Sequence, residues 1–277
     1  MKEKEEFDYE SKPFGIGELS TAPTSIPALK LRYCFDDLGA LQKKLGKEFL
    51  RVLEIGCGGG AMAKAIKSYF PKFKVVGCDI GRKALKFAQK NSKGVNFVYG
   101  DVYDLPFKKG SFDAVVNFDF LEHLTDLSKA LSEMGRVLVP SGLLHSAVPY
   151  EGSRWTLHGW LKIFGWRAKE VYCGHVNFFK IGEPENFIKK AGFKLVKRRF
   201  STHLFYQFFD ASYFSLTALR KKNFPYQVEG YLAVEKKGVF RNLLFLAKSV
   251  IAVISYFESR ILFWFPGLTG HLTCIKK

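Results

Sequence analysis

The chain has no pair of cysteines at a spacing that binds metal or marks a redox motif. Its five cysteines, at positions 34, 57, 78, 173 and 274, include no Cys-x-x-Cys pair and have no histidine at zinc-ligand spacing. We therefore expect no metal site. An odd number of cysteines, two of them at expected strand or turn positions, indicates reduced thiols, which are typical of the cytosol.

Long uncharged apolar runs are missing as well. Residues 1–6 are charged and no hydrophobic stretch follows them, so we expect no secretory signal and a cytoplasmic protein. The apolar stretch 240–265 has a longest charge-free run of only nine residues, 249–257, whereas a membrane span needs ~20.

Acidic residues are scarce in the second half of the chain. Residues 151–277 hold 21 Lys and Arg against 8 Asp and Glu, a balance of +13, whereas residues 1–150 hold 22 against 18, a balance of +4. All four tryptophans also lie in the second half. A basic and aromatic surface attracts polyanions, so nucleic acid and an anionic membrane surface are the expected partners. No recognisable RNA-binding module is present, which makes nucleic acid the weaker choice.

The most informative segment is a glycine-rich turn between a strand and a helix. The apolar residues 52–55 run into glycines at 56, 58 and 60, and the helix-forming residues 61–66 follow. Glycine lets the backbone bend tightly and approach a ligand, and the helix start points its free N–H groups at that ligand. Turns of this kind bind NAD, FAD or adenosylmethionine.

Two carboxylates follow the turn at the pitch of successive strand–helix units. Asp79 ends the apolar run 75–78, and Asp101 follows the short strand 95–99. An acid at the end of the second strand holds ribose hydroxyls in nucleotide-binding α/β folds, and Asp101 is placed to accept a hydrogen bond from an adenine amino group. The glycines do not follow the dinucleotide spacing Gly-x-Gly-x-x-Gly. The pattern therefore favours adenosylmethionine over a nicotinamide cofactor.

These motifs resemble those of class I S-adenosylmethionine-dependent methyltransferases, in the methyltransferase type 11 group that includes the ubiquinone and menaquinone C-methyltransferases. The resemblance covers roughly residues 31–237, and it rests on segments 52–60, 75–85, 100–116, 121–124, 133–144 and 191–193. It implies an enzyme that uses S-adenosylmethionine as its cofactor. It also implies cofactor contacts from Glu54, Gly56, Cys57, Gly58, Gly60, Asp79, Ile80, Asp101, Val102 and Phe118.

Five residues near the ends of the fourth and fifth strands are candidate general bases or acceptor contacts: Asp119, Glu122, His123, His145 and His175. Of these, His123 belongs to the Glu-His-Leu pattern and His175 resembles a lid histidine of the group, whereas His145 lies within a strand pattern, which favours a core or edge position. A general base is needed only if the acceptor must lose a proton, and His123 has an alternative role in ordering a helix start. Segment 117–120 lacks the Asn/Asp-Pro-Pro-aromatic signature of enzymes that methylate base amino groups, which weakens a nucleic-acid acceptor.

We expect a doubly wound α/β fold: a mostly parallel, seven-stranded, Rossmann-like sheet with helices on both faces. The expected strands lie near 51–55, 74–79, 95–99, 113–118, 142–148, 193–197 and 231–236. The expected organisation is an N-terminal arm (1–30), a methyltransferase domain complete at Lys237 (31–237), acceptor-side insertions (149–183 and 200–230) and an aromatic, amphipathic helical tail (238–277).

In the tail, polar residues fall on one narrow helical stripe, namely Arg241, Lys248, Ser255 and Ser259. A helix in the membrane interface with its basic side chains at the headgroups fits this pattern, and packing on its own domain or in a homodimer is the alternative. The sequence thus predicts a cytoplasmic, peripheral membrane methyltransferase with an amphipathic or lipid-linked small-molecule acceptor. A soluble RNA methyltransferase and a non-catalytic, adenosylmethionine-binding scaffold remain alternatives.

Overall fold

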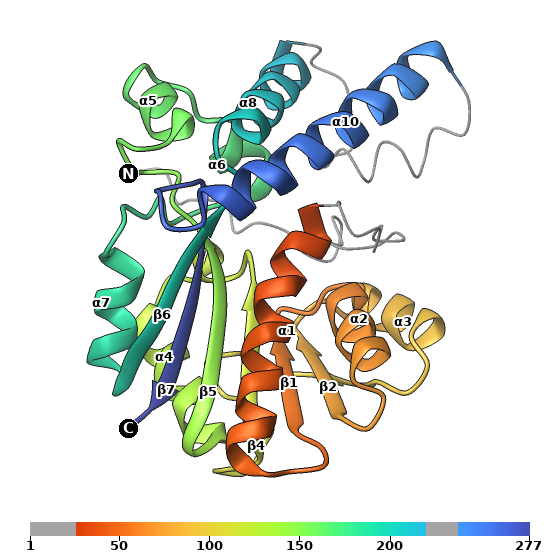
Figure 1. The fold of residues 1–277 in the computed structure, drawn as a ribbon, viewed down its shortest axis with the longest axis vertical. Coiled ribbons are helices and arrows are strands. Elements are labelled where there is room, and N and C mark those ends of the chain that lie inside the picture. Colours follow the sequence, from red (N-terminus) through yellow and green to blue (C-terminus); the bar gives the residue numbers. More distant parts are fainter. Residues whose placement is uncertain (1–25, 220–237) are drawn as a thin grey trace.

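The computed structural model describes residues 26–219 and 238–277, and one seven-stranded sheet lies at its centre in the order β3-β2-β1-β4-β5-β7-β6 (Figure 1). All neighbouring strands are parallel except β7, which is antiparallel to β5 and β6. The strands are β1 (Arg51–Ile55), β2 (Lys74–Asp79), β3 (Asn96–Tyr99), β4 (Phe112–Phe118), β5 (Leu138–Pro149), β6 (Phe193–Ser201) and β7 (Thr269–Lys276). The predicted mostly parallel, doubly wound sheet is confirmed.

Helices cover both faces of this sheet, as expected for buried parallel strands. On one face Leu38, Ile66 and Leu85 of three helices join a buried cluster with the sheet, and on the other face Met134 and Ile188 do so. The helices on the first face are α1 (Ile26–Leu45), α2 (Ala61–Tyr69) and α3 (Arg82–Asn91), and those on the second are α4 (Leu127–Val137) and α7 (Glu183–Lys190).

The strand order reverses at β1, which pairs with β2 on one side and β4 on the other. A ligand crevice therefore lies at the C-terminal ends of these strands. Four further helices stand at that end of the sheet, where insertions were predicted to cap the acceptor side (Figure 1). These cap helices are α5 (Leu157–Ile163), α6 (Ala168–Cys173), α8 (Leu204–Leu219) and α10 (Val239–Ile261).

The seventh strand is not where the sequence predicted it. Residues 231–236 lie outside the described part of the chain, and β7, at Thr269–Lys276, fills the sheet between β5 and β6. The prediction that the sheet is complete at Lys237 is therefore wrong. This strand was missed because it contains a glycine, a histidine and two threonines. Polar residues in a strand pattern indicate an exposed edge, whereas here His271 and Thr273 are buried.

Helix α10 packs on the domain through its two serines and exposes large apolar side chains. Ser255 and Ser259 are fully buried, and Thr202 donates its backbone N–H to Ser259 Oγ at 3.1 Å. Leu243 and Phe257, in contrast, are 59% and 57% exposed. At these two serines the helix packs on its own domain, which was the alternative to a helix in the membrane interface.

Candidate active site

The glycine-rich turn links β1 to α2 and has the backbone conformation that its sequence predicts. Gly56, Gly58 and Gly60 have φ of 72°, 48° and 79°, a left-handed region that side chains with a Cβ rarely adopt. A Cβ at Gly56 would also overlap the ring of Phe120. Only glycine fits there, and the backbone is left open to a ligand at the start of α2.

Asp79 at the end of β2 holds this turn in place. Gly58 donates its backbone N–H to Asp79 Oδ2 at 2.7 Å, and Gly81 donates to Oδ1 at 2.7 Å. Each carboxylate oxygen accepts more than one hydrogen bond, so Asp79 can bind both the turn and ribose hydroxyls. The predicted ribose acid therefore lies against the glycine-rich turn.

Glu54 is buried directly before the turn. Burial raises the pKa of its carboxyl well above the ordinary value, while the backbone N–H of Ala63 offers a hydrogen bond. Among the described residues its Oε2 has no partner. The methionine end of adenosylmethionine carries an ammonium group that can satisfy such an atom. Cys57, also in the turn, is buried, and burial raises the pKa of its thiol, so this cysteine is an uncharged packing residue.

The residues predicted to contact adenine lie where β2 and β3 end together. Gly100 donates its backbone N–H to Asp79 O at 3.1 Å, which brings the residues after both strands side by side. Ile80 is 48% exposed there although it is apolar, and Val102 is buried. Asp101 Oδ1 accepts the N–H of Tyr103 at 2.9 Å. An exposed isoleucine beside a fixed carboxylate fits one face and one edge of an adenine ring.

At the end of β4, Phe118 is buried and Asp119 is held in a left-handed conformation with φ of 48°. The Asp119 backbone N–H donates to Ala147 O at 2.9 Å, and its carboxylate pairs with Lys30 of α1. Sequence analysis missed Lys30, because nothing in a helix sequence shows which strand end its side chain reaches. The pair joins the first helix to the mouth of the crevice.

His123 and His175, far apart in sequence, come together at the acceptor side. His123 ends the short 3-10 helix η1 (Leu121–His123), and its ring centroid lies 4.9 Å from that of His175. Burial and the neighbouring His175 lower the pKa of His123 to about 4, so it is neutral at physiological pH. His145, in contrast, is a core residue beneath α1, with Nδ1 2.8 Å from Asp37 Oδ2.

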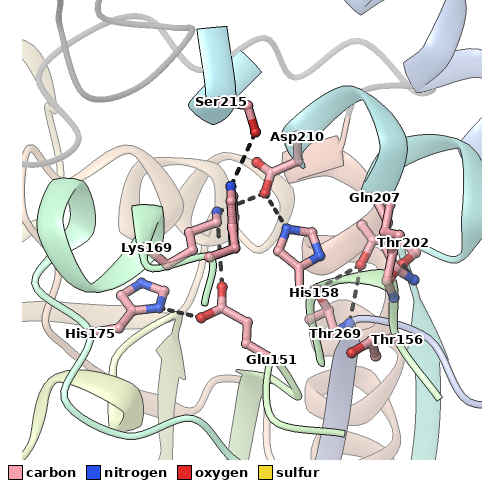
Figure 2. A network of polar contacts seen from close by, with 12 residues as sticks. Glu151, Thr156, His158, Lys169, His175, Thr202, Gln207, Asp210, Ser215 and Thr269 are labelled. Carbon is pink, nitrogen blue, oxygen red and sulfur yellow. Dashed lines mark hydrogen bonds and ion pairs between the residues drawn. The ribbon is translucent and has the colours of Figure 1, made fainter. Parts of the chain in front are cut away.

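A buried polar network under the cap holds His175 in place (Figure 2). Its Nδ1 lies 2.7 Å from Glu151 Oε2, and the ring nitrogen donates because an ionised carboxylate only accepts. Burial by itself would raise the pKa of the Glu151 carboxyl. The charge of His175, its hydrogen bond to Glu151 and the charge of Lys169 outweigh burial and lower this pKa to about 2. Glu151 lies two residues after the end of β5 and was missed by sequence analysis.

Lys169 and Asp210 extend the network into the cap helices (Figure 2). Lys169 Nζ lies 2.8 Å from Asp210 Oδ2 and 3.9 Å from Glu151 Oε1, and His158 Nε2 lies 2.9 Å from the same Asp210 oxygen. Burial lowers the pKa of Lys169, but Asp210 and other acids outweigh it and raise the pKa well above its ordinary value. Helices α5, α6 and α8 are thus tied by charge to the end of β5.

Comparison with known proteins shows which family and which folds this chain resembles. Residues 53–146 match the family described as "Methyltransferase domain". Over most of the chain the fold is also that of a protein from Galdieria sulphuraria assigned as a sarcosine dimethylglycine methyltransferase (TM-score 0.56, 15% identity, 89% of this chain and 84% of that one). The cyclase SpnF has the same fold (TM-score 0.53, 16% identity, 86% of this chain and 79% of that one). The resemblance to class I methyltransferases is confirmed.

Individual relatives match over part of the chain. The fatty-acid O-methyltransferase of Mycolicibacterium smegmatis is 37% identical over 33% of this chain and 34% of its own length. The demethylmenaquinone methyltransferase of Thermus thermophilus is 35% identical over 38% of this chain and 50% of its own length. The aligned part thus spans about a third to a half of these relatives. The acceptor side is therefore argued from this chain's own residues.

Proposed function

We propose that this protein is an S-adenosylmethionine-dependent methyltransferase whose acceptor is an amphipathic or lipid-linked small molecule reached at a membrane surface. The observation that carries this proposal is the set of exposed apolar side chains on the cap helices, which stand at the end of the sheet where the candidate active site lies (Figure 1). The relatives named above act, by their names, on a fatty acid and on a quinone precursor, which agrees with an apolar acceptor.

Residues of the cofactor half would bind and position the methyl donor. Gly56 and Gly58 would allow close approach of the methionine moiety, Glu54 would meet its ammonium group, and Asp79 would hold the ribose. Ile80 would pack on adenine, with Asp101 and Val102 at its edge, and Phe118 or Asp119 would line the methionine side. The cofactor's sulfonium is already reactive, so the protein mainly has to align the acceptor with the methyl group and exclude water.

Asp119, His123 and His175 stand on the other side of the crevice, where the acceptor would enter. His175 is rigidly oriented by Glu151, and Asp119 is fixed by Lys30. Fixed polar groups of this kind position a hydroxyl, phenol or carboxyl acceptor. They lie beneath cap helices whose outer sides are apolar, so an acceptor with an apolar tail can leave the tail at the surface.

The outward apolar face spans three elements of the cap. It includes Trp160 and Phe164 on and after α5, Phe208 on α8, and Trp264 after α10, all more than half exposed. Exposed aromatic patches of this extent mark interaction sites, and Trp and Tyr favour the membrane interface. The basic balance of residues 151–277 attracts anionic headgroups. A bilayer surface offers an apolar layer for the aromatic side chains and anionic headgroups for the basic ones.

Residues Asn242–Ile261 of helix α10 are long enough and apolar enough to span a membrane, and only 17% of the most apolar segment is buried. The short charge-free run of this helix had argued against a span. Two observations favour a helix lying in the interface. Ser255 and Ser259 are packed on the domain, and Arg32 of α1 donates from Nη1 to Tyr256 OH at 2.8 Å. Insertion across a bilayer would break these contacts.

The reaction is tested with adenosylmethionine labelled on its methyl group, the purified protein and a whole-cell extract. We expect the label in the organic phase, because an apolar acceptor extracts there, and mass spectrometry then names the product. Label in an RNase-sensitive precipitate would instead make this an RNA methyltransferase. Cofactor binding without any labelled product from such extracts would favour the scaffold.

Membrane binding is tested by flotation with vesicles of mixed zwitterionic and anionic lipid. Replacing Leu243 and Phe257 by Asp should weaken binding at least tenfold, since each apolar side chain contributes ~1.5–3 kcal/mol on burial. Val196→Asp, at an exposed position on β6, is the matched control and should bind as the wild type does. Wild-type protein that stays in solution, or a dimer that only the α10 variant dissociates, would assign the face to a second copy.

A further inference from the structure

Glu122 is a buried carboxylate that the described contacts leave unexplained. Its side chain is fully buried, and among the described residues neither carboxylate oxygen has a hydrogen-bond partner. Its backbone carbonyl accepts the N–H groups of Val176 and Asn177 at 3.0 and 2.9 Å, which fixes the residue against the segment that carries His175. Burial of a carboxylate without partners is costly, so the position calls for a cationic ligand.

Two imidazoles lie beside this carboxylate. Glu122, His123 and His175 each offer a ligand atom, and the three atoms lie within 4.8 Å of one another. The bond from His175 Nδ1 to Glu151 leaves Nε2 as the ligand nitrogen. This is the carboxylate–histidine–metal arrangement, in which the carboxylate orients the ring and raises its basicity.

The cationic side chains near the cluster are engaged elsewhere. Lys30 pairs with Asp119, and Lys169 is closer to Asp210 than to Glu151. Glu151 is paired with His175, whereas the buried carboxylate oxygens of Glu122 have no hydrogen-bond partner among the described residues. A cation held by the three ligands would supply that partner.

We propose that Glu122, His123 and His175 bind one divalent transition-metal cation, with Glu151 as the positioning residue of His175. Two imidazoles and one carboxylate suit Zn²⁺ and leave a fourth position open, whereas Mg²⁺ prefers oxygen ligands. Bonds of about 2.0–2.2 Å place ligand atoms roughly 3.4 Å apart, so small side-chain rotations close the site. The earlier expectation of no metal rested on cysteine spacing, and this cluster contains no cysteine.

The proposed metal site goes beyond the proposed function, and the bound cation would activate the methyl acceptor. An open position on the cation binds an acceptor oxygen and lowers the pKa of a hydroxyl or phenol. Cation binding itself requires no acceptor. Its measurement therefore succeeds or fails independently of the methyl-transfer experiment.

The test is calorimetric titration of Zn²⁺ into the full-length, untagged protein after treatment with a chelator. We expect one ion per chain, a raised melting temperature with Zn²⁺, and loss of both effects in Glu122→Gln and His175→Ala. Glu151→Gln should keep the site but weaken it roughly 10–100-fold. Cobalt substitution should give a visible spectrum without a thiolate charge-transfer band.

Glu48→Gln is the matched control, because Glu48 is an exposed carboxylate paired with Lys72 on the surface, and it should bind Zn²⁺ as the wild type does. Glu122→Gln keeps its backbone contacts and buries a neutral group, so the metal-free variant should melt no lower than the metal-free wild type. The proposal is overturned if the wild type binds no ion, or if the Glu122 and His175 variants bind it unchanged.

Discussion

A chain that ends at Lys237 is expected not to fold. Such a truncation removes β7, whose residues from Thr269 pair with β5 and with β6. In the sheet order, β6 has β7 as its neighbour, so β6 would detach. Leu272 and Cys274, both fully buried in the core, would be lost with it. These losses exceed the ~5–15 kcal/mol by which a domain is stable.

Far-UV circular dichroism and soluble yield measure this outcome, and a pair of point variants separates the strand from the helix before it. Leu272→Asp places a charge in the core and should unfold the protein or cost more than about 4 kcal/mol. Leu243→Asp makes the same change on the exposed side of α10 and should leave the melting temperature nearly unchanged. A truncated protein that folds and binds cofactor would show that β7 is dispensable.

Replacement of Asp79 by Ala should abolish measurable binding of adenosylmethionine. Hydrogen bonds to a charged group contribute about 1.5–3 kcal/mol each, so the loss of two ribose hydroxyl contacts predicts roughly a 10²–10⁴-fold lower affinity. The variant also frees the N–H groups of Gly58 and Gly81, which loosens the turn. Calorimetry with the cofactor or its demethylated product measures the affinity.

Two controls make this result specific. Asp36→Ala removes an exposed carboxylate of α1 and should leave the affinity unchanged. Asp101→Ala removes one contact at the adenine edge and should weaken binding by roughly tenfold. If Asp79→Ala binds the cofactor with wild-type affinity while remaining folded, the assignment of the ribose site is wrong.

The cofactor half could be predicted because its signals are local. Each strand from β1 to β4 is a short apolar run, and the functional residue follows at its end, as Gly56 and Asp79 do. Parallel strands carry those ends to one edge of the sheet, so sequence position alone brings the residues together. The bounds of β6 were less well predicted. The expected strand ended at residue 197, whereas β6 continues to Ser201 and Arg199 is buried against Asp37.

The acceptor side could not be predicted in the same way. Glu151, Lys169, His175 and Asp210 come from four separate segments, and their ion pairs exist only because the cap helices fold over the end of β5. A single charged residue in a sequence does not reveal its partner. His175 was found through the resemblance and Glu122 was among the candidate bases, but Glu151, which orients His175, and the clustering of Glu122 with the two histidines were not predicted.

The sequence by itself determined the α/β class, the glycine-rich turn and the positions of two carboxylates at strand ends in the candidate cofactor site, because backbone conformation and strand ends follow from neighbouring residues. Only the tertiary structure decided which strand completes the sheet, which side of α10 faces outwards and which groups surround His175. Burial depends on residues distant in the chain, so Ser255, His271 and Glu122 became interior groups that no local pattern marks as buried.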